Sequence, residues 1–393
     1  MFTNYNQGVK CISLYTELTQ TRIELPCCKG PYVKMCQPVS ININKLGDQK
    51  LQLGIIEGDL DFEGPVGETS NSFLYANDDA EVTITEHNGD IYGHASLDNG
   101  EDYDIEYCGN DIHVVKQMDR SRMPRANHLM NGEVGNVATR TEEPEMSVTD
   151  TTTIVTFSIK FYYTPQFATV TAKVDGFIKQ AIAVTNQGFI NSKAPLRVQS
   201  CGSERTTFDE IVNSDEMWDK FTTYIGTAEE LRGTADAAAL LVVDSDVCGL
   251  SNMDATGSGE TITLIAKSCV LTQYVLGHEL GHNLGLGHNK EQEANEIYPD
   301  GLGYLIPGGK YMTIQAYSSK LEEMEINYYS NPDVVFPKTG QPTGIKGSSN
   351  SVRVLTQKRF AMAGLGDESK CTSGKATTTE SSDYYNYYYY NNY

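Results

Sequence analysis

Residues 278–288 read HELGHNLGLGH and place three histidines within one short stretch. The chain has only seven histidines among its 393 residues, so nearly half of them gather here. His278 and His282 are four residues apart, and on a helix that spacing puts both rings on one face, one turn apart. Two imidazole nitrogens placed in this way bind one zinc ion at about 2.0–2.1 Å each.

The residues around this pair complete a catalytic pattern. Gly285 lets the chain leave the helix in a positive-φ conformation, and His288 then returns as a third ligand. Three protein ligands leave a fourth position open, as in catalytic zinc sites. Glu279 lies within reach of a zinc-bound water, whose pKa zinc lowers to about 7. We therefore predict one Zn²⁺ held by His278, His282 and His288, with Glu279 as the general base in peptide-bond hydrolysis.

Alternating strand and helix patterns surround the motif from residue 151 to 366 and predict an α/β domain. Residues 271–284 fit the helix that carries the first two histidines, and the apolar run AAALLVVDSD fits a buried strand ahead of it. Further strands are expected in TIVTFSIKFYYT, PLRVQS and TITLIAKS. Further helices are expected in FATVTAKVDGFIKQAIAVTNQGFINS, DEMWDKFTTYI and SVRVLTQKRFAMAGL.

The first 150 residues follow a different pattern. We expect an irregular, cysteine-containing segment over 1–39 and a β-meander over 40–118, whose turns include Asn88-Gly89 and Asn99-Gly100. Residues 119–150 lack periodicity and indicate a linker. Its basic start, with Arg120, Arg122 and Arg125, is either a protease cleavage site or an ordinary solvated loop. Residues 367–393 form a low-complexity tail rich in tyrosine and asparagine, which we expect to be disordered.

Composition narrows the partners and the compartment. A formal net charge of −22 disfavours nucleic acid and anionic membranes as partners, and no apolar run is long enough to span a bilayer. Nine cysteines indicate an oxidising compartment and leave at least one thiol unpaired within the chain. No signal peptide is visible at the start, which a truncated beginning would explain.

HELGHNLGLGH resembles the extended zinc signature of the metzincin metalloproteases, HExxHxxGxxH. Residues 154–365 resemble the reprolysin-like, M12-type branch, in segments such as VDGFIKQAIAVTNQGFINS and ALLVVDSDVCGL. The resemblance implies a catalytic domain with a mixed sheet and two long helices above a smaller lower part. It also implies secretion as a zymogen, protein or peptide substrates, and a disulfide between Cys248 and Cys269. We expect a monomer.

Two positions depart from that pattern. Asn289 stands where the adamalysin-like branch usually has aspartate after the third histidine. Gln315, in KYMTIQAYSS, stands where metzincins carry the methionine of the Met-turn, and Met312 replaces it only if the turn is shifted. A buried amide at that position needs hydrogen bonds of its own. Tyr317 is a candidate for assisting the oxyanion, although it is one of 24 tyrosines and packing alone also explains it.

The resemblance makes the N-terminal region propeptide-like. Cys108 or Cys36 then becomes a candidate latency thiol, and a disulfide or a buried thiol is the alternative for each. The acidic stretch DNGEDYDIE does not fit the spacing of an EF-hand loop, and we expect it to be a solvated hairpin edge.

Other functions fit parts of the sequence. A zinc-binding pseudo-protease acting as an interaction module is suggested by Gln315, but the intact Glu279 favours an active enzyme. A gluzincin-type site would take its third ligand from a downstream glutamate, and His288 at the metzincin offset disfavours it; these glutamates are Glu291, Glu293 and Glu296. Four residues later in the chain are candidates for the wall of the substrate pocket, and ordinary loop packing explains them equally well: Ile326, Tyr328, Tyr329 and Pro332.

Overall fold

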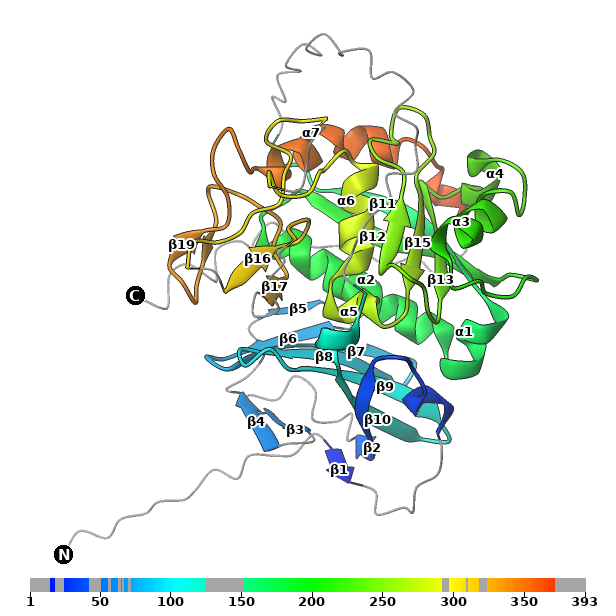
Figure 1. Ribbon diagram of the computed structural model, residues 1–393, viewed down its shortest axis with the longest axis vertical. Helices are drawn as coiled ribbons and strands as arrows, with labels where there is room; N and C mark the ends of the chain where they lie inside the picture. The colour runs from blue at the N-terminus through cyan, green and yellow to red at the C-terminus, as the bar shows by residue number, and fades with distance from the viewer. Residues whose placement is uncertain are drawn as a thin grey trace, which may run out of the picture.

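The chain is mixed α/β and contains several sheets (Figure 1). The computed structural model describes residues 15–17, 25–41, 51–55, 58–62, 65, 67–69, 72–124, 151–291, 297–308, 310–317 and 324–371. The predicted linker beyond residue 124 and the predicted tail beyond residue 371 lie outside these ranges.

An antiparallel sheet occupies the N-terminal part, in the order β1-β2-β10-β9-β8-β7-β6-β5. The predicted meander is present, and its Asn88-Gly89 turn has positive φ at both residues, 53° and 86°. Its apolar side chains form a cluster of their own around Tyr75, Val82 and Tyr103. The strands of this sheet are β1 (Tyr15–Glu17), β2 (Val33–Ile41), β5 (Gly67–Thr69), β6 (Ser72–Ala76), β7 (Ala80–His87), β8 (Asp90–Leu97), β9 (Asp102–Gly109) and β10 (Ile112–Met118). A separate hairpin joins β3 (Leu51–Ile55) and β4 (Gly58–Phe62).

The cysteine-containing segment is more regular than the sequence predicted. Its strand β2 pairs antiparallel with β10, so this segment extends the sheet. The Cys27–Cys108 disulfide joins the short 3-10 helix Pro26–Cys28 to β9, and Cys28–Cys36 joins that helix to β2. These disulfides restrict the conformations of the segment, and the periodicity of its sequence gives no sign of that restriction.

The second sheet has the order β12-β11-β13-β15-β14, parallel except for the antiparallel edge strand β14. The central strand β13 is buried along its whole length, as its continuous apolar run predicted. The long helix α2 packs along β12, and α6 packs along β14 and β15. The bounds are β11 (Val155–Tyr163), α1 (Pro165–Val170), α2 (Val174–Asn191), β12 (Leu196–Arg205), α3 (Ser214–Thr222), α4 (Ala228–Arg232), β13 (Ala237–Val242), β14 (Gly249–Ser251) and β15 (Ile262–Ala266).

The helix predicted over 271–284 is interrupted. It consists of α5 (Cys269–Thr272) and α6 (Val275–Asn283), separated at Gln273 and Tyr274. Tyr274 has φ 50° and lies in the left-handed region, which ends one helix and redirects the next. Cys269 opens α5 and is bonded to Cys248, so the disulfide implied by the resemblance is confirmed.

Short elements and one longer helix follow the third histidine. They are β16 (Tyr311–Thr313) with β17 (Met324–Ile326), β18 (Val335–Phe336) with β19 (Gln341–Pro342), α7 (Ser351–Ala363) and the 3-10 helix Glu368–Lys370.

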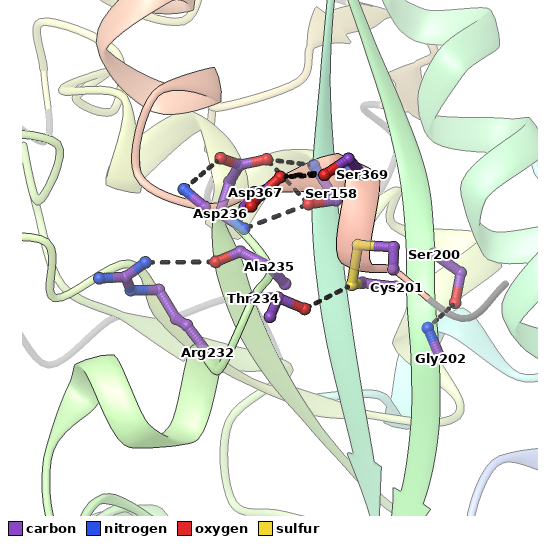
Figure 2. Close-up of a disulfide and its surroundings, with 12 residues drawn as sticks. Ser158, Ser200, Cys201, Gly202, Arg232, Thr234, Ala235, Asp236, Asp367 and Ser369 are labelled. Carbon is purple, nitrogen blue, oxygen red and sulfur yellow. Dashed lines mark hydrogen bonds between the residues drawn. A yellow bond between two sulfur atoms is a disulfide. The ribbon is translucent and has the colours of Figure 1, made fainter.

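The end of the described chain is fastened to the second sheet (Figure 2). The Cys201–Cys371 disulfide joins it to β12. Asp236, ahead of β13, accepts hydrogen bonds from the Ser158 amide at 2.7 Å and the Gly366 amide at 2.8 Å. Four disulfides within the described residues fit folding in an oxidising compartment. Among the described helices, none has the length and apolar character that crossing a bilayer requires.

Candidate metal centre and active site

The three histidines of the motif converge on one point. His278 and His282 project from α6, and His288 follows the end of this helix. The Nε2 atom of His282 lies 3.1 Å from that of His278 and 3.1 Å from that of His288. One ligand atom from each of the three residues lies within 4.8 Å of the others, and all three side chains are buried.

The backbone turn after α6 brings His288 back to the helix. Gly285 has φ 93°, and its amide donates to the His282 carbonyl at 2.8 Å. The Leu286 amide donates to the Gly281 carbonyl at 2.9 Å, which completes a glycine-terminated helix end. The Leu286 carbonyl then accepts a hydrogen bond from His282 Nδ1 at 2.7 Å.

This donor set fits a zinc ion. Because Nδ1 of His282 donates to a carbonyl, its Nε2 carries the lone pair that faces the other two rings. Tetrahedral zinc with nitrogen ligands at 2.0–2.1 Å places neighbouring nitrogens about 3.3 Å apart, close to the two separations of 3.1 Å. Burial lowers the pKa of His282 to about 4 and that of His288 well below its usual value. Both rings are therefore neutral at pH 7, as metal ligands must be.

Glu279 lies beside the first histidine, buried against the edge strand β14. A Cβ atom at Gly249 would lie 2.3 Å from Glu279 Oε1, so only glycine leaves room for the carboxylate in this position. Burial raises the pKa of Glu279 to about 8, and the neighbouring Ser251 opposes that rise. The HExxH motif identifies Glu279, but nothing in the sequence marked Gly249 as its neighbour.

Gln315 lies beneath α6, as the comparison with the Met-turn predicted. Its side chain is fully buried, and its Nε2 donates to the His278 carbonyl at 2.5 Å. A Cβ atom at Gly281 would lie 2.1 Å from that Nε2, so the glycine in HELGH makes the close approach possible. Gln315 has φ 82° within a turn closed by the Ala316 amide and the Thr313 carbonyl at 2.9 Å. The shifted turn considered for Met312 is wrong, because Met312 belongs to strand β16.

Tyr317 reaches the histidines from the same turn. Its hydroxyl lies 3.1 Å from His278 Nε2, and its ring centre lies 4.3 Å from that of His288. Asn289 sets the position of this tyrosine, because its Oδ1 accepts the Tyr317 amide at 2.8 Å. Asn289 Nδ2 in turn donates to Glu291, which places that glutamate in a contact with the asparagine. The glutamates Glu293 and Glu296 lie outside the described residues.

The remaining candidates occupy other places. Tyr329 is fully buried, stacks on Phe189 and donates to the Gly277 carbonyl at 2.8 Å, so it supports α6. Ile326 is also buried, whereas Tyr328 and Pro332 are partly exposed. Cys36 and Cys108, the candidate latency thiols, are both consumed by disulfides. The thiol-based form of latency is therefore wrong for these two residues.

Comparison with known proteins gives relatives of one kind. The chain is 25% identical over 300 residues to a peptidyl-Asp metalloendopeptidase of Stenotrophomonas maltophilia strain K279a, covering 73% of this chain and 71% of that protein. It is 23% identical over 310 residues to a protein of the same name from Xanthomonas campestris, covering 76% and 73%. No family model matches the chain, so the reprolysin-like resemblance stays a prediction.

Two solved structures are only distantly similar. One is a chaperone–substrate complex, with 16% identity and a TM-score of 0.43 over 81% of this chain and 45% of that chain. The other is metalloproteinase-II from Bacteroides fragilis, with 12% identity and a TM-score of 0.33 over 65% and 86%.

Proposed function

We propose that this chain is a zinc-dependent endopeptidase that hydrolyses peptide bonds in proteins. The observation that carries the proposal is the convergence of three imidazole Nε2 atoms, with the Tyr317 hydroxyl at the same point. Relatives named metalloendopeptidases support the same class of reaction. One zinc ion, held by His278, His282 and His288, is the cofactor in this proposal.

The residues divide the chemistry between them. A bound zinc ion supplies Lewis acidity, which lowers the pKa of water and polarises a carbonyl group. Glu279 accepts a proton from the attacking water and returns it to the leaving amine. The Tyr317 hydroxyl donates a hydrogen bond to the oxygen on which negative charge develops. Its contact with His278 and its anchoring by Asn289 support that role.

The position of Gln315 bears on the rival function, a zinc-binding pseudo-protease. The amide contacts the backbone of His278 and leaves its ring facing the other two ligands. Glutamine in place of methionine at position 315 therefore gives no reason to expect loss of peptide-bond hydrolysis. We keep the pseudo-protease as the outcome that the following experiment distinguishes.

The test uses the full chain with an unfolded protein as substrate, because no cleavage preference is assumed. Mass spectrometry follows the cleavage products and shows whether cuts occur at aspartate, the residue in the relatives' name. We expect cleavage that a chelator abolishes and added zinc restores. A folded chain that binds zinc and leaves the substrate intact would establish the pseudo-protease instead.

A further inference from the structure

The N-terminal sheet and the zinc-binding part of the chain share an interface with buried polar contacts. Helix α2 lies across β7 and β8, as Figure 1 shows. A Cβ atom at Gly176 in α2 would lie 2.2 Å from the ring of Tyr92 in β8, so the two elements approach as closely as glycine allows. Gln180 donates from α2 to the Thr83 carbonyl at 3.2 Å, and this bond is buried.

A charged cluster crosses the interface beside this contact. Glu106 of β9 is buried and pairs with Lys116 of β10 at 2.6 Å and with Lys267 at 2.8 Å. Lys267 belongs to the other side of the interface and also donates to the Val170 carbonyl at 2.8 Å. The neighbouring lysines hold the pKa of Glu106 below its usual value against the effect of burial, so the carboxylate is charged. The acidic stretch expected to be a solvated hairpin edge is therefore solvated only at its turn, residues 98–101, whereas Asp102, Asp104 and Glu106 are buried.

The chain beyond the sheet continues along the zinc-binding part. Arg120 forms an ion pair with Asp102 and donates to the Thr272 carbonyl at 2.8 Å, at the end of α5. Gln273 donates to the Pro124 carbonyl at 3.4 Å, and Met123 beside it is buried. This contact runs to residue 124, so the described start of the predicted linker, residues 119–124, packs against the zinc-binding part. The side chain of Arg120 is engaged, which disfavours cleavage at that arginine.

Ion pairs also lie at the edges of this interface. Lys173 pairs with Asp90 near the start of α2, and Lys338 pairs with Asp98 in the lower part of the chain. Together with the hydrogen bonds above, these ion pairs show that the interface includes α2, α5, Gln273 and Lys338.

We propose that the N-terminal sheet stays bound to the zinc-binding part after the chain is cut between residues 125 and 150. None of the four disulfides in the described residues connects the two sides of such a cut. Retention is therefore non-covalent and depends on the buried contacts above. The sheet acts as a permanent partner of α2 and α5, and a cut in the linker does not release it. The proposal concerns association alone and does not require that the chain cleaves peptides.

The test introduces a recognition site for a sequence-specific protease at residues 135–141 in a Glu279→Gln background, which excludes self-digestion. After complete cutting, checked on a denaturing gel, the sample is run on a gel-filtration column at micromolar concentration. We expect both pieces in one peak at the position of the uncut chain. Two separate peaks would overturn the proposal.

A second measurement assigns the retention to the charged cluster. Glu106→Gln leaves Lys116 and Lys267 buried without their carboxylate, so the concentration at which the pieces separate should rise at least tenfold. Adding Lys267→Met should reverse part of that rise, because it removes one of the uncompensated charges. Lys160→Met serves as the control, since its pair with Glu204 lies outside the interface and is partly exposed. No change with Glu106→Gln would refute the assignment to this cluster.

Discussion

Replacing Gln315 by methionine tests how α6, the helix that carries His278 and His282, is supported. The native amide makes one hydrogen bond to the His278 carbonyl, and its buried Oε1 accepts none from the described residues. Losing one hydrogen bond costs about 0.5–1.5 kcal/mol, whereas removing a buried unsatisfied polar atom gains about 1–3 kcal/mol. The positive φ of 82° is common to both side chains and cancels in the comparison. Gln315→Met should therefore change stability by between a loss of about 0.5 and a gain of about 2.5 kcal/mol.

Gln315→Ala is the matched comparison, because it removes the hydrogen bond and also empties a buried volume. By analogy with large-to-small core substitutions it should cost about 2–4 kcal/mol. Thermal unfolding in a Glu279→Gln background gives both values, at about 1 °C per kcal/mol for a chain of this size. Metal content should stay at one zinc in the methionine variant. A fall of more than about 2 °C with methionine, or a folded variant without zinc, would refute this account of the turn.

Three further substitutions have defined outcomes. Tyr317→Phe should lower kcat by about 100-fold with little change in KM, measured on a peptide found in the cleavage assay; an unchanged kcat would leave the tyrosine a packing residue. Gly249→Ala should displace Glu279 and lower kcat at least about tenfold while zinc content stays constant; full activity would contradict the close approach. Burial lowers the pKa of His113 to about 4, and its Nε2 accepts a hydrogen bond from the Ile91 amide. The His113 ring therefore stays neutral in the folded chain at pH 5, whereas in the unfolded chain it gains a proton below about pH 6.5. Stability should then fall by about 2 kcal/mol between pH 6.5 and 5 and fall less in His113→Gln, as urea unfolding at the two pH values would show; equal losses would exclude His113 as the cause.

The sequence predicted the three candidate metal ligands better than it predicted the residues that pack against their helix. The spacing of His278, His282 and His288 is local, so helix geometry alone brings the first two together and a glycine turn returns the third. The position of Gln315 beneath the helix was predicted through the family pattern. Its partner Gly281 could not be recognised as such, because the contact joins segments more than thirty residues apart in the chain.

The largest errors in the sequence analysis concern long-range contacts. The acidic residues of β9 look solvated in sequence, because their partners Lys267 and Arg120 lie far away or beyond the next strand. The break at Tyr274 is also hidden, since a continuous apolar pattern runs through it and only the left-handed backbone separates α5 from α6. In both cases tertiary contacts override a correct local pattern.

The central claim is that the three histidines bind the zinc that makes the chain a peptidase. The most direct measurement determines the zinc content and the cleavage of an unfolded protein in the same preparations of the full chain, Glu279→Gln and His282→Ala. The account predicts one zinc per chain in the first two, none in His282→Ala, and cleavage only in the unmodified chain, at least about 100-fold above Glu279→Gln. A folded, unmodified chain that binds no zinc, or equal cleavage by Glu279→Gln, would contradict it.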